Sequence, residues 1–185
     1  MNAKQLILER RTVRKYTDQP VPEELVLELL DIAVYAPNHK LREPWRFVLA
    51  IDEGRERYVE ELLQLLERSG KFDGKTPEQR KALECQFTTV PVYLTVLCQT
   101  IGTEAQQTED LLATAALIQN IQLLATDIGL GVCWKTGKHW YTEEYEQLVG
   151  VSSTERVVGV LQLGWPDVVP PVKKRESARN KLTHF

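Results

Sequence analysis

The strongest constraint on the fold comes from one long segment, from Glu109 to about Ile128, that is expected to be helical and has almost no polar face. Thr108 precedes this segment as a candidate N-cap, and Gly129-Leu130-Gly131 ends it. A helix that is apolar most of the way round must be covered by other structure, either in a large core or at an interface between subunits. Because the chain has only 185 residues, we favour the interface.

The segments around this helix predict an α+β fold in which helices flank one sheet, within a single domain over residues 1–185. Apolar runs predict strands at 46–51, 92–98, 132–135 and 156–163. Caps, prolines and apolar stripes predict further helices at 3–10, 23–35, 54–69, 77–87 and 142–149. Strand 46–51 is apolar almost without a break, so we expect both of its faces to be buried. No Gly-x-Gly-x-x-Gly sequence follows any strand, which leaves a Rossmann dinucleotide site without support.

Composition narrows the class of protein. The chain has 43% hydrophobic and 26% charged residues, which is typical of a soluble globular protein. Its net charge of −3 argues against a nucleic-acid partner, because such proteins usually carry a basic surplus. No apolar run approaches membrane-spanning length and no signal peptide is evident, so we expect a cytoplasmic protein with no membrane partner. The three cysteines form no Cys-x-x-Cys pair and have no histidine at metal-ligand spacing, so no metal site or disulfide framework is expected.

The segment Arg10-Arg11-Thr12-Val13-Arg14-Lys15-Tyr16 is either an anion-binding site or a solvated basic turn. Arginine presents a planar fork of N–H donors that matches phosphate, and a hydroxyl adds one further donor. The segment follows the carboxyl end of a helix, where the helix dipole does not attract anions, so the side chains must supply the attraction. A second basic cluster, Lys173-Lys174-Arg175, lies in the tail 167–185, which has no apolar pattern and either remains unstructured or wraps around another surface.

No catalytic motif is evident. The chain lacks a Gly-x-Ser-x-Gly elbow, a His-x-x-x-His pair and a phosphate-binding Gly-x-x-x-x-Gly-Lys loop. His39 lies in a polar loop between two prolines, where it is either a surface residue or a ligand contact. Cys133 is expected to be buried and unreactive. If the protein is an enzyme, we therefore assign no catalytic side chain and expect a cofactor to carry the reaction.

Several motifs together resemble one known family. Arg10-Arg11-Thr12-Val13-Arg14-Lys15-Tyr16 is similar to the Arg-Arg-Ser-x-Arg-x-Phe motif of the FMN-dependent nitroreductases. The resemblance continues, in order and over most of the chain, through Val21-Pro22-Glu23-Glu24, Ala36-Pro37, Pro44-Trp45-Arg46-Phe47, Gly129-Leu130-Gly131 and Gly164-Trp165-Pro166. The short length and the Ala-Pro-Asn-His-Lys loop resemble most the minimal subgroup of NAD(P)H nitroreductases.

The resemblance implies a homodimer of α+β subunits, with FMN in two clefts at the interface, the long helix in that interface and the C-terminal tail wrapped over the partner. It also implies roles for particular residues. Those expected to hold the FMN phosphate, the ribityl chain or the flavin edge are Arg10, Arg11, Thr12 and Arg14. The loop that reaches the flavin from the partner subunit would supply Tyr35 and His39. The segment whose backbone N–H groups approach the isoalloxazine would be Trp134, Lys135, Thr136 and Gly137. The tail would add Lys173 and Arg175 to the phosphate site.

The implied activity is reduction of nitroaromatic, quinone or related small electron acceptors, with NADH or NADPH as donor and a ping-pong hydride transfer through flavin N5. Two alternatives stay open: a flavin-dependent dehydrogenase or dehalogenase on the same fold, and a non-enzymatic dimer that binds an anion such as RNA. The chain departs from the family at residues 38–45, where most members have Ser-x-x-Asn-x-Gln-Pro-Trp. The lid helices of larger members are also missing, so we expect a cleft that is open on one side.

Overall fold

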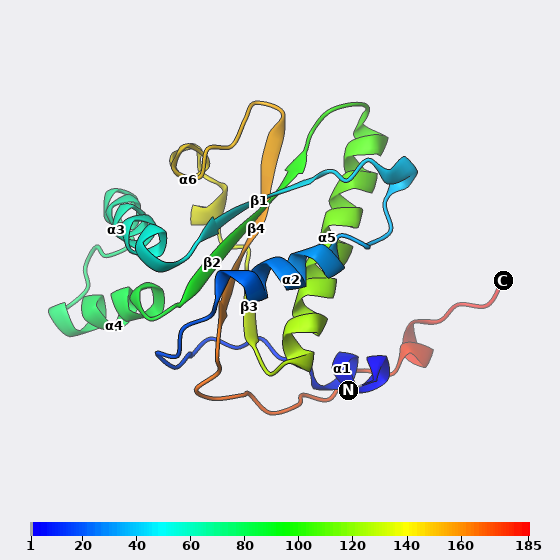
Figure 1. The fold of residues 1–185 in the computed structure, drawn as a ribbon, viewed down its shortest axis with the longest axis horizontal. Coiled ribbons are helices and arrows are strands. Elements are labelled where there is room, and N and C mark those ends of the chain that lie inside the picture. Colours follow the sequence, from blue (N-terminus) through cyan, green and yellow to red (C-terminus); the bar gives the residue numbers. More distant parts are fainter. Residues whose placement is uncertain (1) are drawn as a thin grey trace.

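A four-stranded antiparallel sheet forms the centre of the structure, a computed structural model that describes residues 2–185 (Figure 1). The strands are β1 (Trp45–Ala50), β2 (Val92–Gln99), β3 (Gly131–Lys135) and β4 (Glu155–Gly164), and they lie in the order β1-β2-β4-β3. Each neighbouring pair is antiparallel. The structure thus confirms the α+β class expected from the sequence.

Helices cover both faces of this sheet, and each face has its own apolar core. The α-helices are α1 (Ala3–Glu9), α2 (Glu23–Ala33), α3 (Asp52–Arg68), α4 (Pro77–Thr88), α5 (Glu104–Asp127) and α6 (Glu143–Leu148). Three short 3-10 helices, which the sequence patterns did not predict, are η1 (His39–Leu41), η2 (Lys138–Tyr141) and η3 (Ala178–Lys181). Helices α2 and α5 lie on one side of the sheet, and α3, α4 and α6 lie on the other (Figure 1). Side chains of β2 alternate between the two cores, with Leu94 on the α5 side and Tyr93 on the α3 side.

The predicted start of α5 is wrong by five residues, because the helix begins at Glu104 and not at Glu109. Thr103, and not Thr108, is its N-cap: the Thr103 hydroxyl accepts a hydrogen bond from Gln106 N at 3.3 Å, and Gln106 Oε1 accepts one from Thr103 N at 2.9 Å. This reciprocal pair satisfies two N–H groups that a helix start otherwise leaves free. The hydroxyl of Thr108 instead donates to the carbonyl of Glu104, as it does inside a helix. The other helices and strands begin and end within two residues of the expected positions.

The burial of β1 also differs from the prediction. We expected both faces to be buried, but Phe47, Val48 and Leu49 are only half-buried. The reason is topological, because β1 is an edge strand that pairs with β2 alone. The central strand β2 is instead buried from Val92 to Cys98.

Helix α5 is only partly covered within this chain: between residues 113 and 126 the side chains outside the core are half-buried. Ala113, Leu117 and Ile121 lie in the core, whereas Leu112 on the outer side is 65% exposed. The outer side of α5 therefore offers an apolar surface, exposed at Leu112 and half-covered between residues 113 and 126 by the described part of the chain. No helix among the described residues is both long enough and apolar enough to cross a membrane.

Candidate cofactor-binding site

The backbone after α1 is fixed along the edge of the sheet. Thr12 forms a parallel bridge with Val132 of β3, and Val13 N donates to Val132 O at 3.1 Å. Val13 is buried, and it approaches Gly131 so closely that a Cβ at this glycine would lie 2.8 Å from the valine side chain. The buried hydroxyl of Tyr16 lies 2.9 Å from the carbonyl oxygens of Val13 and Gln162. The apolar side chains thus fix the segment to the sheet.

The basic side chains of this segment gather around a hollow of about 240 Å³. Its lining comes from two distant parts of the sequence: Arg10, Arg11, Thr12, Arg14, Pro170, Pro171, Lys173 and Arg175. Figure 1 shows how this occurs, since the tail after β4, in orange and red, passes beside α1. The structure therefore brings together six of the residues expected at an anion site. No carboxylate is part of this lining in the described chain.

The electrostatics of the hollow favour an anion. Burial lowers the pKa of Arg10, and the nearby charges of Arg11 and Arg175 lower it further. Arg11 donates through Nη1 to the carbonyl of Leu8, while its Nε and Nη2 are buried without a hydrogen-bond partner in the described chain. Buried donors without partners are uncommon in proteins. An anion with several oxygens would satisfy these donors and reduce the repulsion between the guanidinium groups.

A second hollow, of about 450 Å³, shares two residues with the first. Its lining is Arg10, Thr12, Gln119, Gln122, Trp134 and Thr136. Gln122 comes from α5 and is almost fully buried, and its Oε1 accepts a hydrogen bond from Arg10 Nη1 at 3.2 Å. Sequence reasoning missed Gln119 and Gln122. The sequence did contain a signal for them, because the two amides are three residues apart. This spacing places them on the same side of a helix that is otherwise apolar.

Trp134 forms a wall of the second hollow because a glycine lies beneath it. A Cβ on Gly159 of β4 would lie 2.0 Å from the indole Nε1, so only glycine allows the ring to lie against the strand. The indole Nε1 is buried and has no hydrogen-bond partner in the described chain. Among the other predicted residues of this segment, Thr136 lines the hollow, and Lys135 and Gly137 do not.

His139, which follows this segment in η2, is a titratable group that sequence reasoning left out. Its ring lies 4.5 Å from the ring of Trp140, and its Nε2 is buried without a partner in the described chain. Burial lowers the pKa of His139 to about 4, and the charges of Lys71 and Lys135 contribute to the decrease. His139 is therefore neutral at physiological pH and does not add to the charge of the site.

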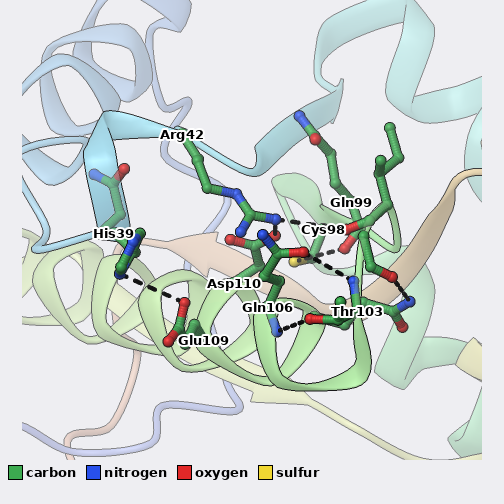
Figure 2. A network of polar contacts seen from close by, with 12 residues as sticks. His39, Arg42, Cys98, Gln99, Thr103, Gln106, Glu109 and Asp110 are labelled. Carbon is green, nitrogen blue, oxygen red and sulfur yellow. Dashed lines mark hydrogen bonds and ion pairs between the residues drawn. The ribbon is translucent and has the colours of Figure 1, made fainter.

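Tyr35 and His39 line neither hollow in the described chain. Tyr35 is 87% exposed, and His39 Nδ1 lies 3.6 Å from Glu109 Oε2 in the first half of α5 (Figure 2). Gln122 is 13 residues further along this helix, which corresponds to roughly 20 Å at 1.5 Å per residue. For His39 the expected approach to a flavin therefore needs a second subunit, and for both residues this approach stays a prediction.

An antiparallel sheet with helices on both faces, together with an arginine-rich hollow, defines an α+β protein with a candidate anion-binding site. The chain belongs to the nitroreductase family, whose sequence model matches residues 7–165, and it is accordingly an oxidoreductase. A Bacillus subtilis (strain 168) protein named "Putative NAD(P)H nitroreductase YfhC" is 37% identical over 180 residues, which are 97% of this chain and 92% of that protein.

Two solved structures extend the comparison. A nitroreductase-like family protein from Bacillus cereus superposes with a TM-score of 0.89 at 35% identity, covering 100% of this chain and 96% of that one. The FMN- and NADPH-dependent nitroreductase NfnB from Sphingopyxis sp. strain HMH has a TM-score of 0.75 at 17% identity, with 100% and 99% of the two chains covered. At this low identity, the second structure bears on the fold alone. Together they confirm the nitroreductase fold that the sequence motifs indicated.

Proposed function

We propose that this chain is an FMN-dependent oxidoreductase that uses NADH or NADPH to reduce nitroaromatic compounds, quinones or related small electron acceptors. In this proposal, residues 1–185 form one FMN-binding domain. The observation that carries the proposal is the arginine-rich hollow, which shares Arg10 and Thr12 with a larger hollow walled by Trp134. The name of the 37% identical relative YfhC, "Putative NAD(P)H nitroreductase", supports it.

The residues present fit the phosphate end of FMN. A phosphate monoester carries almost two negative charges at neutral pH and offers three acceptor oxygens. Arg11 has two buried donors without partners in the described chain, and the pKa of Arg10 is lowered first by burial and then by the charges of Arg11 and Arg175. Both observations are expected of a site in which a bound anion accepts the free hydrogen bonds and balances the positive charge. Arg14, Lys173 and Arg175 line the same hollow and would add to the attraction.

The second hollow fits the remainder of the cofactor. Thr12, Gln119 and Gln122 offer a hydroxyl and two amides, which suit the hydroxyl groups of a ribityl chain. Trp134 offers an apolar wall, which suits a flat ring system. An anion site that continues into a polar and then an aromatic lining matches the order of phosphate, ribityl and isoalloxazine along FMN.

When bound, FMN supplies the redox chemistry, in which a hydride passes from NADH or NADPH to flavin N5 and then, in a ping-pong sequence, to the acceptor. The protein side chains would bind the cofactor and orient it. Gln122 holds the Arg10 guanidinium through its 3.2 Å hydrogen bond, and the indole of Trp134 excludes water from one wall. Neither hollow is lined by an Asp, Glu, His or Cys side chain in the described chain. We therefore assign no catalytic side chain.

A homodimer is part of the proposal. The outer side of α5 leaves Leu112 exposed, and Ile7 and Leu8 of α1 are also more than half exposed. Residues 171–185 of the tail are exposed along their whole length. Apolar surfaces of this kind mark contacts with other molecules. A second copy would cover them and bring Tyr35 and His39 to the flavin.

Purification followed by a visible spectrum and flavin extraction tests the proposal. We expect a yellow protein, or a colourless one that takes up FMN, and oxidation of NADH or NADPH when a nitroaromatic compound or quinone is added. A protein that takes up no FMN and oxidises neither nicotinamide would refute it. A screen of acceptors, run on the FMN-loaded protein, then identifies the substrate class.

A further inference from the structure

The loop between α2 and β1 has a strained backbone. Lys40, Leu41 and Glu43 have φ angles of 54°, 52° and 45°, although none of them is glycine. Residues with a side chain avoid this left-handed region, and they remain there only where surrounding contacts hold them. Such strain is concentrated at functional sites.

Two sets of contacts hold the loop in this shape. Within the loop, Asn38 Oδ1 accepts a hydrogen bond from Glu43 N at 3.0 Å, and His39 O accepts one from Arg42 N at 3.2 Å. Outside it, the Arg42 side chain reaches across to α5, where its Nη2 lies 2.6 Å from Asp110 Oδ2 (Figure 2). The same nitrogen lies 3.5 Å from the carbonyl oxygen of Ile101. The ion pair is thus the stronger of the two links that Arg42 makes to the rest of the protein.

The position of Asp110 indicates that this ion pair orients the loop. Asp110 is 1% exposed, and the Arg42 side chain is mostly covered. Buried ion pairs contribute little net stability, because desolvation offsets most of the attraction. Here the pair joins the loop to α5 and so restricts where the loop can lie. Asp110 also lies near the thiol of Cys98, whose pKa is raised by burial first and then by this carboxylate. The Arg42 guanidinium is therefore fixed to α5 at the buried carboxylate of Asp110.

The outer side of the loop faces away from its own chain. Leu41 is 80% exposed, and the half-exposed His39 has its Nδ1 3.6 Å from Oε2 of Glu109, which neighbours Asp110 on α5. Leu112, on the same part of α5, is also exposed. A strained loop that carries an exposed leucine beside an uncovered helix surface fits contact with a second copy of the chain.

We propose that Arg42 and Asp110 are positioning residues, which hold residues 38–43 in the shape that completes the flavin-ring end of the site in a second subunit. This inference rests on the proposed FMN-binding function. It predicts that loss of the ion pair weakens binding of FMN and of riboflavin by the same factor, because the loop acts on the ring and not on the phosphate.

The test is a double variant, Arg42→Met/Asp110→Leu, which removes both charges and leaves no buried carboxylate unpaired. The matched control is Arg46→Met/Glu155→Leu, which removes an ion pair between β1 and β4 outside the loop, with the Arg46 side chain 44% and the Glu155 side chain 12% exposed. Hydrogen exchange on the FMN-free protein reports on the loop, through the amides of Arg42 and Glu43. Fluorescence titrations with FMN and with riboflavin report on binding.

For the double variant we expect exchange of these two amides to accelerate at least tenfold, and both flavins to bind about tenfold more weakly. The control should match the unsubstituted protein in both measurements. Unchanged exchange would overturn the inference, and so would faster exchange with unchanged flavin affinity. If the double variant does not fold, Arg42→Lys is measured in the same way, with the same outcomes. Failure of the FMN proposal is distinguishable, because the unsubstituted protein itself would then bind neither flavin.

Discussion

Replacement of Arg10 by alanine should weaken FMN binding and leave riboflavin binding almost unchanged. Arg10 lines both hollows. Its guanidinium donates a hydrogen bond to Gln122 and lies among the cationic side chains of the first hollow. A hydrogen bond to a charged group contributes about 1.5–3 kcal/mol. Loss of that contribution corresponds to a dissociation constant for FMN that is about 10- to 150-fold higher. Riboflavin lacks the phosphate, so its affinity should change by less than about threefold.

The assay is a fluorescence titration of the FMN-free protein with each flavin, and Lys15→Ala is the matched control. Lys15 belongs to the same basic segment but is exposed and does not line the hollow. We expect the Lys15 variant to behave as the unsubstituted protein does at 0.15 M salt, where exposed charges are strongly screened. Turnover per bound FMN should persist in Arg10→Ala. Equal weakening of both flavins, or loss of turnover at full FMN occupancy, would show that Arg10 does not act as a phosphate anchor.

Three further predictions concern the scaffold. Gly159→Ala places a methyl group against the Trp134 indole, so we expect altered tryptophan fluorescence and a loss of about 1–3 kcal/mol in the free energy of unfolding; an unchanged spectrum would contradict this. Thr103→Ala removes the N-cap of α5 and should cost about 1 kcal/mol in urea denaturation, and a cost near zero would argue against the assigned cap. The hydrogen bond from Arg46 lowers the pKa of Glu155 to about 2, below its usual 4.5, so this pair stabilises the fold above pH 4.5 and the stabilisation is lost as pH falls toward 2. Glu155→Gln should flatten stability over that range, and an unaltered pH profile would exclude this role.

Local patterns were sufficient for most of the elements, because caps, prolines and apolar periodicity act within a few residues. These patterns gave the wrong prediction where the outcome depended on a particular hydrogen bond or on the pairing of the strands. Thr108 has the chemistry of a cap, but the reciprocal bonds of Thr103 and Gln106 start α5 earlier. Strand β1 has the composition of a buried strand, but its place at the sheet edge depends on the pairing of all four strands.

In the candidate site, too, some residues could be predicted from local sequence and others could not. The basic segment was recognisable because its arginines are consecutive or nearly so in the sequence. Its meeting with Lys173 and Arg175 depends on the path of a tail that has no apolar pattern, so only the resemblance to a family indicated it. Gln119 and Gln122 were hidden in an apolar helix, since their role follows from which side of α5 faces Arg10.

A crystal structure of the protein grown with FMN would test the central claim most directly. The proposal predicts that the phosphate lies in the hollow between the 10–14 segment and the tail, within hydrogen-bonding distance of the Arg11 Nε and Nη2 donors. It also predicts that the flavin ring lies toward Trp134. A phosphate bound elsewhere, with the Arg11 donors still unpartnered, would contradict it.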